Sequence, residues 1–94
     1  MVTFTQLSKD LELTAEPLRV LVFLLDNLDV ERDREISQIE VATALGMHAS
    51  NVNRAIALLV KKEVLIAGPK LGKSCSYRLN HTLFARHHYE RPGQ

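Results

Sequence analysis

Apolar residues recur at helical spacings in the first third of the chain. Phe4, Leu7 and Leu11 lie three and four positions apart, which predicts a short amphipathic helix over residues 4–12. Eight of the eleven residues 18–28 are apolar, so a helix there has almost no polar face. Because a helix that is apolar all round is typical of a protein core, we predict that this one is the buried centre of the domain.

Start signals mark the elements on either side of a charged loop. Thr14 is predicted to cap the apolar helix. Residues 29–35 are mostly charged and have no apolar periodicity, which predicts a loop leading into a short strand at residues 35–36. Ser37 and Glu40 then have the spacing of a capping box, in which each side chain binds the other residue's free N–H, and a second helix is predicted to begin there.

Residues 37–62 are predicted to form two amphipathic helices that fold about one glycine. The first helix places Ile39, Ala42 and Leu45 on one face. Gly46 follows directly and permits the left-handed backbone conformation of a sharp turn. The chain is therefore expected to reverse direction at this glycine.

The next helix is predicted to begin near His48 or Ser50. At about 100° per residue its apolar and polar side chains separate onto opposite faces. The predicted core side consists of Val52, Ala55, Ile56 and Leu59. The predicted outer side consists of Ser50, Arg54, Ala57 and Lys61, flanked by Asn51 and Asn53. This outer side carries two cations and no carboxylate, whereas a solvated helix usually mixes both signs.

Two strand-like runs follow. Residues 64–67 and 75–79 flank a turn of Gly, Lys and Ser residues, which predicts a β-hairpin with a basic tip. In the second strand Cys75, Tyr77 and Leu79 alternate onto one face. The single cysteine can form no internal disulfide, and we predict that it is a small core residue.

The order helix, short strand, helix, glycine turn, helix and hairpin is that of a winged helix-turn-helix. The predicted fold is therefore mainly α with a small β part: a three-helix core plus a β-hairpin wing. In this fold the second helix of the turn enters the major groove of DNA, where Arg and Asn side chains discriminate bases. The predicted recognition-helix residues are His48, Ser50, Asn51, Asn53, Arg54, Ala57 and Lys61. The predicted phosphate contacts, from a helix N-terminus and the wing, are Ser37, Gln38, Lys70, Lys73, Ser74 and Arg78.

The formal net charge of +1 conceals an asymmetry between the two halves of the chain. Residues 1–46 hold four Lys or Arg and nine Asp or Glu, whereas residues 47–94 hold eight and two. Such a split predicts that one face meets a polyanion. The alternative is that helical surfaces carry charges of both signs without such a partner.

Several short motifs between Thr14 and Asn80 match a known pattern. They are Ile36-Ser-Gln, Ala42, Leu45-Gly-Met, Asn51-Val-Asn-Arg-Ala-Ile56, Leu59-Val, Val64-Leu-Ile, Gly68-Pro-Lys and Ser76-Tyr-Arg-Leu-Asn80. With them the segment resembles winged helix-turn-helix regulators of the MarR-like superfamily, and most closely the small replication proteins of the plasmid RepL type. The resemblance implies regulation of transcription or control of plasmid replication. Two departures are His81-Thr-Leu-Phe84, where a Pro and a Trp-containing segment are usual, and Glu63, which stands in place of a usual glycine.

Catalysis, metal binding, cofactors and membrane insertion are not predicted. The chain has four histidines, His48, His81, His87 and His88, but the adjacent pair His87-His88 lacks the i, i+4 spacing that brings two imidazoles onto one helix face. No serine, cysteine or carboxylate pair is placed near a histidine for nucleophilic or acid–base chemistry, so we expect no enzyme. The chain has no apolar run of about 18 residues and no secretory signal, which predicts a cytoplasmic protein.

The expected organisation is a helical lead-in (residues 1–13), a DNA-binding domain (14–80) and a tail (81–94). The predicted partner is double-stranded DNA, bound by a homodimer on an inverted repeat, because one small domain reads only a half-site. The predicted dimer surface consists of Phe4, Leu7, Leu11, Leu83, Phe84 and Tyr89. The pattern indicates no ligand pocket, so control by a small-molecule effector is left undetermined. The alternative function is a winged-helix module that binds protein and not DNA.

Overall fold

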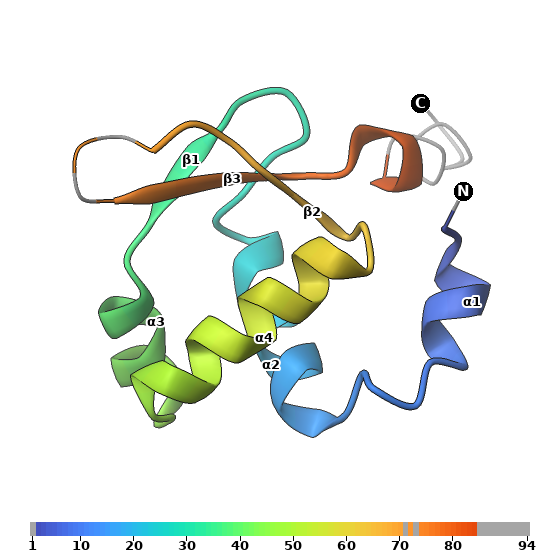
Figure 1. Cartoon of the computed structure of the whole chain (residues 1–94), viewed down its shortest axis with the longest axis horizontal. Helices are drawn as coiled ribbons and strands as arrows, with labels where there is room; N and C mark the ends of the chain where they lie inside the picture. Colours follow the sequence, from blue (N-terminus) through green and yellow to red (C-terminus); the bar gives the residue numbers. More distant parts are fainter. Residues whose placement is uncertain (1, 71, 73, 85–94) are drawn as a thin grey trace.

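Helices and a small sheet make up the part of the chain that this computed structural model describes, residues 2–70, 72 and 74–84. The sheet has the strand order β1-β3-β2, and both pairings are antiparallel. A helical turn at residues 81–84 follows the last strand. The elements, shown in Figure 1, are α1 (Phe4–Ser8), α2 (Ala15–Leu25), β1 (Arg34–Ile36), α3 (Gln38–Leu45), α4 (Ala49–Lys61), β2 (Leu65–Ala67) and β3 (Cys75–Leu79). The chain is therefore mainly helical, with a three-stranded antiparallel sheet.

Helix α4 lies at the centre and packs against α2, α3 and β2. The four residues predicted for its core side, Val52, Ala55, Ile56 and Leu59, are all buried. Their spacing brings them onto one face of the helix, and burying several aliphatic side chains together is the main favourable term for a domain of this size. The prediction of the inner face of α4 is confirmed.

Helix α2 is only partly buried, and the prediction that it is buried all round is wrong. Val20 and Leu24 have no exposed surface, whereas Leu18, Val22 and Leu25 are 43%, 67% and 42% exposed. One side of α2 packs against α4 and α3, and the other side faces outward. A helix without a polar face contains no local signal for which side becomes the outside.

Helix α3 buries only part of the apolar face that the sequence pattern indicates, namely Ala42 and, in part, Leu45. Ile39 is 71% exposed, and the buried residues are Val41 and Ala42. Because neighbouring residues point about 100° apart on a helix, an inward face centred on these two turns Ile39 away from the core. The predicted turn is confirmed: Gly46 is left-handed (φ 65°), and the Met47 N–H closes the helix end on the Ala42 carbonyl at 2.9 Å.

The N-terminal caps differ in part from the prediction. Ser37 caps α3, and its hydroxyl accepts a bond from the Glu40 N–H at 3.3 Å. Within the described residues the reciprocal bond of the predicted capping box is not formed. A complete capping box occurs instead at α1, between Thr3 and Gln6.

The lead-in helix is shorter than predicted and ends at Ser8. Leu11, predicted on its apolar face, is 93% exposed. The reason lies in the segment around it: Lys62 at the end of α4 binds the carboxylates of Asp10 and Glu12. These two ion pairs hold the segment against α4 and leave Leu11 pointing outward.

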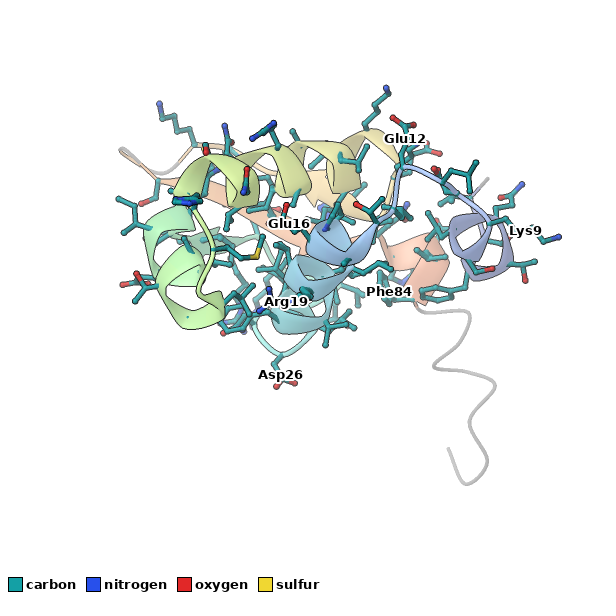
Figure 2. All side chains as sticks on the ribbon, turned by 90° about the horizontal axis from the view of Figure 1, so that it is seen from below. Lys9, Glu12, Glu16, Arg19, Asp26 and Phe84 are labelled. Atoms are coloured by element: carbon teal, nitrogen blue, oxygen red, sulfur yellow. The ribbon has the colours of Figure 1, made fainter. Side chains whose placement is uncertain are left out.

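Much of the surface predicted for dimerisation is occupied within the chain. Leu7 and Leu83 are buried in the same core as α2 and α4. Phe4 packs edge to face on Phe84 with ring centroids 5.3 Å apart, and Figure 2 shows Phe84 next to α1. Tyr89 lies outside the described residues. Buried side chains cannot contact a partner, so the prediction that Leu7 and Leu83 belong to a dimer surface is wrong.

The faces of β3 also differ from the simple alternation. Cys75 is exposed, so the prediction of a core cysteine is wrong, while Ser76 and Tyr77 are both buried. The Ser76 hydroxyl donates to the Pro69 carbonyl at 2.5 Å. A Cβ at Gly68 would lie 2.7 Å from the same hydroxyl oxygen. The hairpin loop therefore covers the side of β3 that was predicted to be open, and the close approach explains a glycine at position 68.

Candidate nucleic-acid interface

The outward face of α4 is exposed and built from small or hydrogen-bonding side chains. Asn51 is half-buried, and Ser50, Asn53, Arg54, Ala57 and Lys61 are exposed. The sequence of α4 contains no Asp or Glu. The structure thus brings the predicted recognition residues together on one surface, and their role in binding stays a prediction.

A chain of hydrogen bonds orients Arg54. Its Nη2 donates to Asn51 Oδ1 at 2.7 Å, and Asn51 Nδ2 donates to Glu16 Oε2 at 3.4 Å. Glu16 belongs to the first turn of α2, and Figure 2 shows it close beneath α4. Asn51 therefore uses both ends of its amide inside the protein. The remaining guanidinium N–H groups of Arg54 can still donate outward.

Gln38 connects the start of α3 to α4 and to the sheet. Its Nε2 donates to Asn53 Oδ1 at 3.1 Å. Burial raises the pKa of the Tyr77 hydroxyl and the neighbouring Cys75 thiol adds to the rise, whereas a hydrogen bond from Gln38 opposes it. Gln38 is therefore held between β3 and the outward face of α4.

His48 is the N-cap of α4 and acts through its backbone. Its carbonyl accepts bonds from the Asn51 and Val52 N–H groups at 3.0 and 3.1 Å. Its imidazole makes no capping bond in the described structure, and the residue is exposed. The side chain is thus available on the surface at the start of α4.

The hairpin lies at the same end of the molecule as α3 and the start of α4, as both views show (Figures 1 and 2). Lys70 is exposed, Ser74 is half-buried, and Lys73 lies outside the described residues. Arg78 is half-buried, and its Nη1 lies 4.0 Å from Asp33 Oδ1. This ion pair was not predicted, and it offsets part of the positive charge expected on the wing.

Carboxylates flank the other end of α4. Lys62 Nζ lies 2.9 Å from Asp10 Oδ2 and also binds Glu12. Hydrogen bonds from Lys62 hold the pKa of both carboxyls below the usual range, and the same bonds raise the pKa of Lys62. Figure 2 shows Glu12 beside the C-terminal end of α4. Carboxylates therefore lie beside both ends of α4: Asp10 and Glu12, paired with Lys62, at its C-terminal end, and Glu16, next to Asn51, in its N-terminal half.

Sequence reasoning missed the acidic partners of this surface. Glu16 lies 35 residues from Asn51, and Glu12 lies 50 residues from Lys62. No local spacing rule connects residues so far apart, because their contact depends on how α2 and the lead-in pack on α4. The only sequence signal was the acidic excess of the first half of the chain.

Among the described residues no three His, Cys, Asp or Glu side chains are grouped to hold a metal ion, and His87 and His88 lie outside that range. Each helix in the same range lacks the length and apolarity that crossing a bilayer requires. Comparisons with protein-family models, with curated proteins and with solved structures found no significant match to this chain.

Proposed function

We propose that this chain is a winged helix-turn-helix protein that binds double-stranded DNA through α4. In this proposal α3 and α4 form the helix-turn-helix about Gly46, and the β2–β3 hairpin is the wing. The element order and the strand order β1-β3-β2 support the fold. The observation that carries the function is the exposed face of α4, which has small and hydrogen-bonding side chains and no carboxylate of its own.

In the proposed complex the N-terminal half of α4 lies in the major groove, which is about 12 Å wide and admits one helix. Ser50 and Ala57 are small enough to let the helix approach the bases. Arg54, held by Asn51, donates two N–H groups to guanine, the commonest specific contact in this groove. Lys70 and Arg78 bind phosphates, which add affinity but carry no sequence information.

A selection from a random duplex pool, followed by fluorescence anisotropy, tests this proposal. Arg54→Ala is expected to weaken binding to the selected duplex by about 1–3 kcal/mol and to relax the preference at one base position. Lys70→Ala is expected to weaken binding to all duplexes and to lower the salt slope by about one. Arg32→Ala is the matched control, because Arg32 is an exposed arginine in the loop before β1.

The outcomes separate base reading from general attraction. Equal losses on selected and random duplexes for Arg54→Ala would contradict base reading by this residue. The selected sequences also reveal the symmetry of the site. Regulation of transcription and control of plasmid replication, the two roles that the family resemblance implies, would both use this surface.

A second candidate function is a winged-helix module that binds protein. The observation that favours it is the exposed apolar face of α2, formed by Leu18, Val22 and Leu25. Such a module would bind neither heparin nor random duplex at low salt, where any phosphate-binding surface is at its strongest. This result would overturn the proposal of DNA binding.

A further inference from the structure

The exposed side of α2 combines an apolar stripe with two opposite charges. Leu18, Val22 and Leu25 follow the i, i+4, i+7 spacing that places side chains on one helix face. Arg19 and Asp26, which is the C-cap of α2 and keeps a helical backbone conformation, are exposed beside the stripe, and on a helical wheel both lie on the same flank of Val22. The stripe is therefore bordered on one side by one positive and one negative charge.

The spacing of these residues is self-complementary. Leu18 and Leu25 lie seven residues apart about a centre near Val22, and so do Arg19 and Asp26. Seven residues span about two helical turns, or about 10 Å. A second α2, placed antiparallel by a two-fold axis at Val22, would set Leu18 against the partner's Leu25 and Arg19 beside the partner's Asp26. Each of these contacts would occur twice, as a two-fold interface requires.

The two charged side chains are placed to make such pairs. Arg19 Nη2 donates to the Leu45 carbonyl at 2.8 Å, which holds the guanidinium on the surface and uses one of its five N–H groups. In the described part of the chain the Asp26 carboxylate has no ion-pair partner. Figure 2 shows Asp26 pointing away from α4. A shallow groove next to the stripe, lined by Phe23, Asn27 and Leu45, adds apolar surface to this face.

We propose that the protein dimerises through α2, with two copies packed antiparallel along Leu18, Val22 and Leu25 and with Arg19 and Asp26 paired reciprocally. The arrangement of Arg19 and Asp26 favours a second copy of this chain over an unrelated partner. In a two-fold contact each copy must supply both the positive and the negative side chain, and this segment carries both. Since Asp26 points away from α4, the two α4 faces would lie on opposite sides of the dimer and could each meet a separate ligand. This inference does not depend on DNA binding.

Analytical ultracentrifugation of the full chain at about 10–100 µM tests the proposal, because a single helix pair is a small interface and predicts micromolar affinity. The wild-type chain is expected to sediment as a dimer. Arg19→Glu and Asp26→Lys each place like charges at both pairs, and each is expected to raise the dissociation constant more than about tenfold. An equimolar mixture of the two variants is expected to restore the dimer, because each changed charge then meets its opposite.

Three further variants make the test decisive. Val22→Asp places a carboxylate at the two-fold axis and is expected to abolish the dimer. Arg19→Gln removes the positive charge without reversing it, so it is expected to weaken the dimer less than Arg19→Glu does. Glu31→Lys changes an exposed charge outside α2 and should leave the dimer intact. Circular dichroism establishes that each variant is folded, and if Arg19→Glu unfolds, Val22→Asp and Asp26→Lys still test the interface. A wild-type monomer throughout this concentration range, a dimer that survives Val22→Asp, or a mixture of folded variants that stays monomeric would overturn the proposal.

Discussion

Helices α2 and α4 pack against each other, yet they present opposite chemistry to the outside. The apolar residues of α4 occupy one face, and Val52, Ala55, Ile56 and Leu59 are all buried. The residues of α2 are almost all apolar, and three large aliphatic side chains remain exposed. The sequence of an amphipathic helix thus determines which side of the helix faces the core. For a helix that is almost entirely apolar, the buried side depends on which neighbours cover it.

The difference also separates two kinds of surface. The outside of α4 is polar, which suits a hydrated, charged ligand such as nucleic acid. The outside of α2 is apolar with two compensating charges, which suits a protein surface, since contiguous exposed apolar patches mark interaction sites. The domain therefore has one polar and one apolar outer surface, and under the two proposals above each would meet a different class of partner.

Two adjacent leucines of α2 give the largest expected effect. Leu24 is fully buried and Leu25 is 42% exposed. Leu24→Ala is expected to lower the free energy of unfolding by about 2–5 kcal/mol, because it leaves a cavity in the core. Leu25→Ala is expected to cost less than about 1 kcal/mol. Urea denaturation at concentrations too low for dimer formation measures both, and equal costs would show that α2 is rotated from the position described above.

The end of α4 provides a stabilising substitution. Glu63 adopts φ 64°, the left-handed conformation that glycine usually takes after a helix. The N–H of Glu63 bonds to the Val60 carbonyl at 3.0 Å, and that of Val64 bonds to the Leu59 carbonyl at 2.9 Å. Because a side chain is strained in this conformation, Glu63→Gly is expected to raise the free energy of unfolding by about 0.5–1 kcal/mol. Gly46→Ala, at the equivalent position after α3, is expected to lower it, and a loss of stability in Glu63→Gly would contradict the assigned turn.

Glu16 tests how α2 influences the outward face of α4. Glu16→Gln keeps an oxygen to accept the bond from Asn51 but removes the negative charge. If α4 binds DNA, affinity for every duplex is expected to rise by about two- to fivefold at low salt, and the gain should shrink as salt screens it. Glu31→Gln is the matched control. An unchanged affinity for Glu16→Gln in anisotropy titrations would show that the phosphates bind far from this carboxylate.

Acid stability tests the ion pairs of Lys62 with Asp10 and Glu12 at the C-terminal end of α4. Lys62 holds the pKa of Asp10 and Glu12 below their ordinary values in the folded state. This contribution to stability is present above the ordinary carboxyl pKa and is lost as the pH falls through the lowered folded-state values. Lys62→Met is therefore expected to flatten the decline in melting temperature below about pH 5. Lys70→Met serves as the control. An identical decline in melting temperature with falling pH for Lys62→Met and wild type would contradict a stabilising role of these ion pairs.

Sequence patterns predicted well those features that depend on interactions between residues close together in the chain. Gly46, the Ser37 cap, the inner face of α4 and the hairpin follow from backbone geometry and periodicity, which act within a few residues. The lead-in was predicted too long because the ion pairs that hold Leu11 outward involve Lys62, 50 residues beyond Glu12. The burial of Ser76 was not predicted, because alternation along β3 ignores the loop that covers this residue.

The candidate site divides in the same way. Which residues of α4 point outward was predictable from a helical wheel. That Asn51 is engaged by Glu16, or that Arg78 faces Asp33, was not predictable, because both contacts join segments brought together only by packing.

By itself the sequence determined that these helices and strands form, that the chain turns at Gly46, and which side of α4 is apolar, since these depend on spacing and capping between near neighbours. Only the tertiary structure decided which side of α2 is exposed and which carboxylates lie beside α4. Those outcomes depend on which distant surfaces bury the most apolar area together, and that is a property of the whole packed chain.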